Sequence, residues 1–135
     1  MRFAKILFWF AGAWGILVLA PMFFLYAKVG EYSPPPPTHP EFYFGFLGVA
    51  LVWQFVFFVI ATDPARFRLL IPVAVLEKLS YVVVLFVLYL QGRITAFQFG
   101  PAVPDALLCL LFVVAFFKAG PGPQRVASAP IQTRN

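Results

Sequence analysis

The sequence predicts an all-α fold: an integral membrane four-helix bundle with both termini on the cytoplasmic side. Of its 135 residues, 62% are hydrophobic and only 11% are charged, whereas soluble domains carry about 25% charged residues. Four apolar runs of membrane-spanning length follow one another within residues 1–118, and lysines and arginines collect on one side of the predicted bundle. A water-soluble fold of this length could not cover so much apolar surface.

The first predicted span covers residues 6–26, an uncharged run that follows the basic Arg2 and Lys5. At about 1.5 Å per residue it crosses a hydrocarbon core of about 30 Å. A secretory signal peptide also begins with a basic stretch and an apolar run. We prefer a span, because the run is longer than such a signal needs and Pro21 directly follows Ala20, the best cleavage candidate. Pro21 is also expected to kink the outer part of this helix.

Residues 28–40 are predicted to be an exposed loop, because residues 34–37 are four successive prolines. Such a run favours polyproline II, an extended spacer without internal hydrogen bonds. Thr38 and Glu41 then match a capping box, in which the threonine hydroxyl caps the next helix and the glutamate reaches back to the threonine amide. This pattern favours a structural role for Glu41 and His39 over a metal site.

The second and third predicted spans are residues 42–61 and 69–90. Their connector, residues 62–68, is short and begins with a Thr-Asp-Pro cap, so the two spans are predicted to be antiparallel neighbours. Glycines in the first two spans leave notches where helices can approach closely. These glycines are Gly12, Gly15, Gly45 and Gly48.

The last predicted span covers residues 102–117, which at about 24 Å is short for a bilayer. Either the bilayer is therefore thinner around this span, or residues 96–99 of the preceding connector lie partly inside the membrane. Asp105 falls in the first turn of the span, where a carboxylate favours the helix dipole. Residues 119–135 show no apolar periodicity and are predicted to be a disordered cytoplasmic tail.

The orientation is predicted from the basic residues, which favour the cytoplasmic side. With a cytoplasmic N-terminus, Lys28 and Arg93 are the basic residues outside, and residues 33–39 face the outer side. Arg93 and Asp105 are then candidate outer-side polar residues. The basic residues placed inside are Arg2, Lys5, Arg66, Arg68, Lys118, Arg125 and Arg134.

The third span contains an adjacent Glu77 and Lys78, each of which costs roughly 2.5–3.5 kcal/mol at the centre of a spanning helix. Gln54 and Glu77 are both predicted to lie about 10–12 Å from the inner boundary, so their side chains are expected to meet. Ser80 and Tyr81 share the Glu77 face of the helix. Lys78 points away and is expected to snorkel toward the inner headgroups. These five residues form the candidate intramembrane polar cluster.

Two interpretations of this cluster are open. In the first, which we prefer, neighbouring polar groups satisfy Glu77 and the cluster fixes the register of the helices. In the second, the cluster is the polar floor of a pocket for a lipid, a quinone or a proton. A large cavity reaching Glu77 would favour the pocket, and a filled interior would favour the register role.

Missing residues argue against several functions. Thiol–quinone oxidoreduction needs a cysteine pair, but Cys109 is the one cysteine, and it is predicted to be a buried small apolar residue. A zinc site needs three or four ligands, which one histidine without nearby partners does not supply. Nucleotide-binding, serine-hydrolase and zinc-protease motifs do not occur, and the basic residues are too scattered for a nucleic-acid partner. We therefore predict no catalytic residue, cofactor or metal.

The chain combines four spans, a long first outer loop, short later connectors and a Pro-Asp opening to the last span. With residues 41–45 (EFYFG), Glu77-Lys78 and residues 104–106 (PDA), this architecture resembles the small DoxX-like bacterial membrane proteins and their uncharacterised relatives. The resemblance implies a four-helix membrane bundle, and it carries over no functional residue.

The predicted function is that of an accessory or interaction protein in a bacterial inner membrane, belonging to an oxidoreductase or envelope complex. The alternative is a binder or transporter of a hydrophobic small molecule, a lipid or a quinone, in a pocket near Glu77. An enzyme acting on a lipid ranks third. The predicted partners are the lipid bilayer and either another membrane protein or a second copy of the chain.

Overall fold

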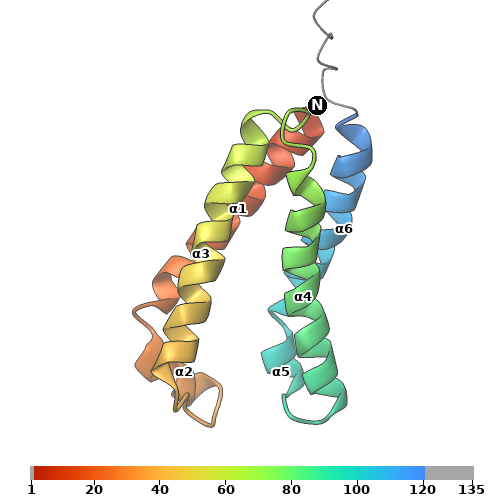
Figure 1. Cartoon of the computed structure of the whole chain (residues 1–135). Helices are drawn as coiled ribbons and strands as arrows, with labels where there is room; N and C mark the ends of the chain where they lie inside the picture. The colour runs from red at the N-terminus through yellow and green to blue at the C-terminus, as the bar shows by residue number, and fades with distance from the viewer. Residues whose placement is uncertain (1, 121–135) are drawn as a thin grey trace, which may run out of the picture.

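The computed structural model describes residues 2–120, and all regular secondary structure in this part of the chain is helical. The tail predicted from residue 119 lies, from residue 121 onward, outside the described residues. Four helices are long and two are short (Figure 1). They are α1 (Arg2–Met22), α2 (Tyr26–Tyr32), α3 (Pro40–Thr62), α4 (Leu70–Leu90), α5 (Ala96–Phe99) and α6 (Ala102–Lys118).

Within residues 2–120, four helical segments are long and apolar enough to cross a membrane, which agrees with the four predicted spans. They are α1, α3, α4 and the combined α5–α6 segment Ala96–Lys118. Residues 96–99 are helical and lengthen the last apolar segment, in line with the second of the two alternatives that the sequence left open. The first helix ends earlier than predicted: after Pro21 the backbone closes tight turns, with the Phe24 amide donating to the Pro21 carbonyl at 3.0 Å.

The segment predicted as a loop after the first span is partly helical. Helix α2 occupies its beginning, and the Tyr26 hydroxyl donates to the Pro37 carbonyl at 2.8 Å. The Tyr43 hydroxyl donates to the Met22 carbonyl, also at 2.8 Å, and so ties the start of α3 to the end of α1. Aromatic residues flanking the proline run therefore fold it back onto the bundle, which the local proline pattern did not indicate.

The predicted capping box at Thr38 and Glu41 is wrong. Pro40 begins α3, so His39 is the cap residue, and no side chain of the described chain caps this helix. Glu41 instead lies 3.2 Å from the ring nitrogen Nδ1 of His39, on the surface. A capping box does form at α5, between Thr95 and Gln98.

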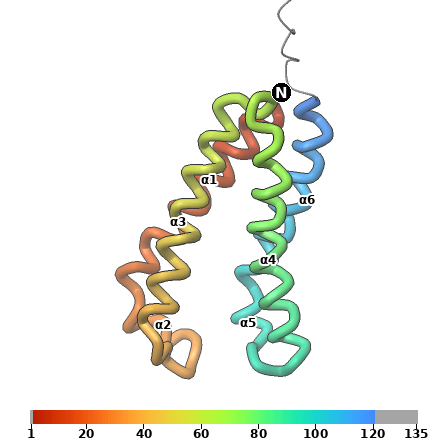
Figure 2. The backbone as a smooth tube through the Cα atoms, in the orientation of Figure 1, coloured from red at the N-terminus to blue at the C-terminus, as the bar shows by residue number. Residues whose placement is uncertain are grey.

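The long helices are arranged as two antiparallel pairs, not as a chain of sequential neighbours. Helix α1 packs along α3 and α4 packs along α6, while α1 also contacts α6. The pairs meet at the end that holds the N-terminus and diverge toward α2 and α5 (Figures 1 and 2). Helices α3 and α4, predicted to be packed neighbours because of their short connector, make few contacts. A short connector thus brings two helix ends together without aligning the helices.

The glycine notches explain which helices pack closely. A side chain at Gly12 would overlap the Phe58 ring, and one at Gly15 would overlap the Gln54 amide, so both glycines let α1 approach α3. At Gly45 and Gly48 an added Cβ meets nothing within 4 Å in the described structure. The prediction of close approach therefore holds for the glycines of α1 and is wrong for those of α3.

Three phenylalanines join the two pairs. Phe8 of α1, Phe57 of α3 and Phe112 of α6 are fully buried. The Phe112 ring centroid lies 4.4 Å from that of Phe8 and 5.2 Å from that of Phe57. The same core cluster contains buried alanines of all four long helices and four larger side chains, Leu7, Ile60, Ile71 and Leu108.

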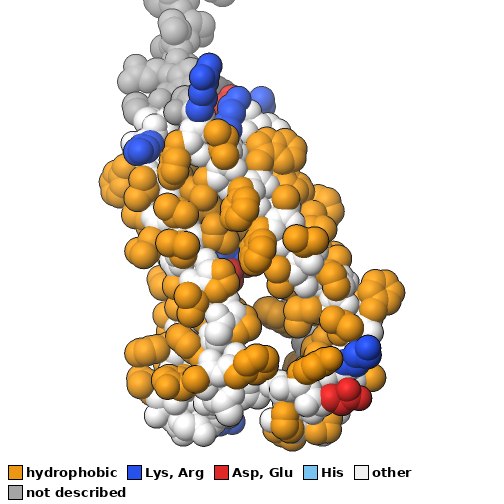
Figure 3. Space-filling view, turned by 180° about the vertical axis from the view of Figure 1, so that it is seen from behind, with side chains coloured by type: hydrophobic (Ala, Val, Ile, Leu, Met, Phe, Trp, Pro, Cys, Tyr) orange, Lys and Arg blue, Asp and Glu red, His pale blue; other side chains and the backbone are white. Residues whose placement is uncertain are grey.

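One end of the molecule is basic, and we call it the basic end (Figure 3). Its residues are Arg2, Lys5, Arg66, Arg68 and Lys118. The Arg68 side chain donates from Nε to the Phe116 carbonyl at 3.2 Å and lies 3.9 Å from the Phe116 ring centroid. This contact fastens the connector before α4 to the end of α6. At the opposite end, Gln98 donates from Nε2 to the Ser33 hydroxyl at 2.7 Å.

Candidate functional site

A cleft lies between the two helix pairs (Figure 3). It holds a cavity of about 350 Å³ that is lined by residues of α1, α3, α4 and α6. Its apolar wall includes Trp14, Val18, Leu19, Met22 and Leu108, and its polar residues are Gln54, Glu77, Lys78, Tyr81 and Asp105. An adjoining groove of about 550 Å³ between α3 and α4 shares Phe46, Ala50, Glu77 and Tyr81 with this cavity.

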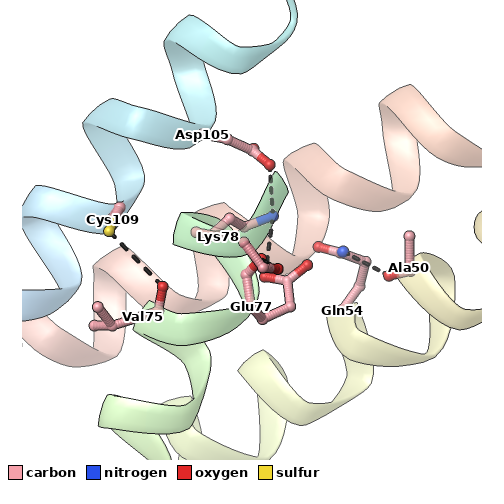
Figure 4. Close-up of polar contacts among 8 residues, drawn as sticks. Ala50, Gln54, Val75, Glu77, Lys78, Asp105 and Cys109 are labelled. Carbon is pink, nitrogen blue, oxygen red and sulfur yellow. Dashed lines mark hydrogen bonds and ion pairs between the residues drawn. The ribbon is translucent and has the colours of Figure 1, made fainter. Parts of the chain in front are cut away.

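Lys78 is buried in the middle of the molecule, so the prediction that it snorkels toward the headgroups is wrong. Its side chain is 7% exposed, and its ammonium lies 3.4 Å from Oδ2 of Asp105 and 3.5 Å from Oε2 of Glu77 (Figure 4). The ammonium also lies 5.2 Å from the ring centroid of Phe57. Two carboxylates and an aromatic face within reach compensate for burial better than a distant headgroup would.

The cluster therefore contains two carboxyl groups and one ammonium. Glu77 and Lys78 are adjacent in α4, while Asp105 comes from the first turn of α6. Adjacent residues on a helix do not normally face each other, but the long lysine side chain reaches both carboxylates. The formal charge of the three groups is −1 when all are ionised.

Gln54 adds an acceptor that has no partner. The residue is 1% exposed, and its Nε2 donates to the Ala50 carbonyl at 2.8 Å. This bond fixes the amide orientation, because a flipped amide would place two acceptor oxygens against each other. Within residues 2–120, the amide oxygen Oε1 has no hydrogen-bond partner. Figure 4 shows this oxygen on the side of Gln54 that faces Glu77 and Lys78.

Glu77 contributes a second acceptor. Its Oε2 lies within ion-pair distance of the Lys78 ammonium, but the geometry is not that of a hydrogen bond, and the atom has no hydrogen-bond partner in the described chain. The hydroxyl of Ser80 donates to the backbone carbonyl of Glu77 at 2.8 Å. Tyr81 stacks on Phe46, with ring centroids 5.8 Å apart. Ser80 is therefore occupied with the backbone and does not satisfy the carboxylate.

Of the predicted cluster, the structure brings Gln54, Glu77, Lys78 and Tyr81 to one cavity. Gln54 and Glu77 line it together, although no hydrogen bond joins them within the described residues. Ser80 lines the adjoining groove instead.

The two candidate outer-side residues separate in the structure. Arg93 is exposed in the turn after α4, whereas Asp105 is the ion-pair partner of Lys78. Sequence reasoning missed this pairing because it assigned Asp105 to the helix dipole. A signal was present: one basic and one acidic residue on two different spans are natural partners in a low-dielectric interior.

Cys109 is buried, as predicted, with its sulfur 3.8 Å from the Val75 carbonyl. In the described part of the chain, no three His, Cys, Asp or Glu residues are grouped so that they could hold a metal ion. What the cleft can offer a bound molecule is hydrogen-bond acceptors, charged side chains and apolar surface.

Comparisons of the chain with protein-family models, with curated proteins and with solved structures find no match.

Proposed function

We propose that the protein binds or transports a hydrophobic small molecule, such as a lipid, in the cleft between its two helix pairs. The observation that carries this proposal is the cavity of about 350 Å³ that reaches Glu77. Small-molecule pockets typically measure about 300–1,000 Å³ and combine apolar walls with a few convergent polar groups. From the sequence, a cavity reaching Glu77 was the observation expected to favour a pocket, and a filled interior was expected to favour the register role of the cluster.

The surroundings of the cleft support the same function. The cavity is lined by residues of four helices that are long and apolar enough to cross a membrane. A lipophilic molecule dissolved in the bilayer is therefore close to the cleft. Buried charges inside membrane helices commonly mark ligand or ion pathways.

A cavity-filling substitution tests this function. Ala50→Phe adds a ring to a residue that lines both the cavity and the groove. Native mass spectrometry of the protein extracted in mild detergent is expected to find a co-extracted small molecule on the wild type and at least tenfold less of it on this variant. The matched control is Val52→Phe on the same helix, because Val52 is exposed and lines neither space. Equal retention by the two variants would contradict the proposal.

The proposed setting is a bacterial inner membrane, with the basic end on the cytoplasmic side. The support is the gathering of Arg2, Lys5, Arg66, Arg68 and Lys118 at that end, since basic residues favour the cytoplasmic side.

Thr38→Cys tests the orientation. Thr38 is exposed between α2 and α3, and the native Cys109 is buried. A membrane-impermeant maleimide is expected to label the variant in intact cells. An Arg66→Cys variant at the basic end is expected to react only after lysis, and the reverse pattern would overturn the orientation.

An accessory or interaction role is the second candidate. Helix α4 favours it, because it has the smallest buried share of the four spans, 17%. Lipid alone can cover such a face, so the role requires a partner that co-purifies in fixed stoichiometry. Native mass spectrometry of the wild-type protein reports that stoichiometry in the same measurement as the retained molecule.

A further inference from the structure

The cleft offers a ligand two buried acceptors, and the donors that line it include the Lys78 ammonium, the Tyr81 hydroxyl and the Trp14 indole N–H. Oε1 of Gln54 and Oε2 of Glu77 both belong to residues that line the cavity, and within residues 2–120 neither atom has a hydrogen-bond partner. Burying an acceptor without a donor is costly. The ammonium of Lys78, the nearest charged donor, is already shared between the carboxylates of Asp105 and Glu77 and lies beside the Phe57 ring. A molecule that completes this site must therefore donate hydrogen bonds.

The charge of the cluster further restricts which head groups a ligand of the cleft can carry. Two carboxyl groups face one ammonium, so an anionic head such as a carboxylate or phosphate would add like charge in a low-dielectric interior. A quinone, one of the classes raised from the sequence, carries only acceptor oxygens, so it donates no hydrogen bond to the Gln54 amide oxygen or to the Glu77 carboxylate. A cationic donor satisfies the acceptors and balances the formal charge of the cluster.

The walls indicate what the head group is attached to. The cavity extends from the polar cluster along apolar side chains of α1 and α6, including Trp14, Val18 and Leu108. Aromatic rings of Phe46 and Tyr81 line the same space beside Glu77. Aromatic faces attract cations, and the apolar wall suits a hydrocarbon chain or ring system. The site thus combines a cation-accepting floor with a lipophilic wall.

We infer that the ligand of the cleft is a lipophilic amine, an apolar body with a primary or secondary ammonium and no acidic group. The ammonium donates to Oε1 of Gln54 and to the Glu77 carboxylate, while the apolar body lies along α1 and α6. This inference deepens the proposed function and rests on it.

Three probes with one chain and different heads test the inference: decylamine, decanol and decanoate. The full-length protein is placed in phosphatidylcholine nanodiscs at neutral pH, with each probe at the same mole fraction in the bilayer. Native mass spectrometry then measures the bound fraction. Decylamine is expected to reach at least tenfold the occupancy of decanol, and decanoate is expected to bind least.

Two variants connect the preference to the cluster. Glu77→Gln keeps an acceptor oxygen and leaves one carboxyl group opposite Lys78, and Asp105→Asn does the same from the other side. Either change is expected to lower the preference for decylamine over decanol at least fivefold, with decanol binding retained. Glu41→Gln is the matched control, since Glu41 is exposed and lies outside the cavity; its preference is expected to equal that of the wild type.

The outcomes separate this inference from the proposed function. Equal binding of decylamine and decanol to the wild type would overturn the amine assignment but leave the proposed small-molecule cleft in place. A preference for decylamine that persists in both variants would have the same consequence. A cleft that takes up only water would bind none of the probes, and this result would overturn the inference and the proposed function together. The comparison among probes needs only the wild type, so it stands even where a variant fails to fold.

Discussion

Lys78→Met is expected to lower the free energy of unfolding by about 3 kcal/mol. The ammonium is almost fully buried and lies within 3.5 Å of two carboxylates. Removing one partner of a buried ion pair typically costs about 3–5 kcal/mol, because the remaining charge stays buried without compensation. Here two carboxyl groups would lose their shared partner. Equilibrium unfolding in mixed micelles measures the loss.

Equilibrium unfolding of a triple variant tests whether uncompensated charge causes the loss of stability in Lys78→Met. Adding Glu77→Gln and Asp105→Asn to Lys78→Met makes the cluster neutral at nearly constant shape, and most of the lost stability is expected to return. Lys28→Met is the matched control, since Lys28 is exposed in α2 and its loss should change stability by less than about 0.5 kcal/mol. A triple variant as unstable as Lys78→Met would show that packing of the lysine stem, not its charge, is what matters.

Phe112→Ala is expected to lower the free energy of unfolding by about 3 kcal/mol, near the lower end of the usual cost of Phe→Ala in a core. Phe112 is fully buried and stacks on Phe8 while meeting the edge of Phe57. The stability is lost because removing the ring leaves a void in the core and abolishes its contacts with Phe8 and Phe57. Lipid surrounds the bundle, so the transfer contribution from water is small. Unfolding in mixed micelles again provides the measurement.

Phe117→Ala is the control for this prediction, because Phe117 lies on the same helix and is 72% exposed. Its effect is expected to stay below about 0.5 kcal/mol. Phe112 also joins α6 to the α1–α3 pair, so its loss should loosen one pair against the other. A Phe112→Ala variant as stable as Phe117→Ala would show that the aromatic trio does not hold the pairs together.

The four spans could be predicted because a span is a local property. A run of about twenty apolar residues is sufficient to mark one, and the structure has α1, α3, α4 and the α5–α6 segment where the runs occur. A contribution of residues 96–99 to the last span was one of two predicted alternatives, the other being a thinner bilayer, since residues 102–117 alone are short for a bilayer. The boundary after Pro21 and the start of α3 were less predictable. Contacts between distant residues accompany them: Tyr26 bonds to Pro37 of the proline run, and Tyr43 bonds to Met22 at the end of α1.

Part of the candidate site could be predicted in the same local way. Gln54, Glu77, Lys78 and Tyr81 stand out as polar residues within apolar runs, and all four line the cleft. The position of Lys78 could not be predicted, because its partner Asp105 lies in another span. Whether a buried lysine turns to the headgroups or to a carboxylate depends on which helix packs beside it.

By itself the sequence determined the four long helical segments, their apolar character and the concentration of basic residues toward one end. Only the tertiary structure decided that α1 pairs with α3, that α4 pairs with α6, and that the pairs diverge to leave a cleft. The reason is physical: among apolar helices in lipid, hydrophobicity does not select a partner, so pairing depends on close packing and polar contacts. Those contacts, such as Gly15 against Gln54 and Lys78 against Asp105, depend on how each helix is rotated and shifted along its neighbour.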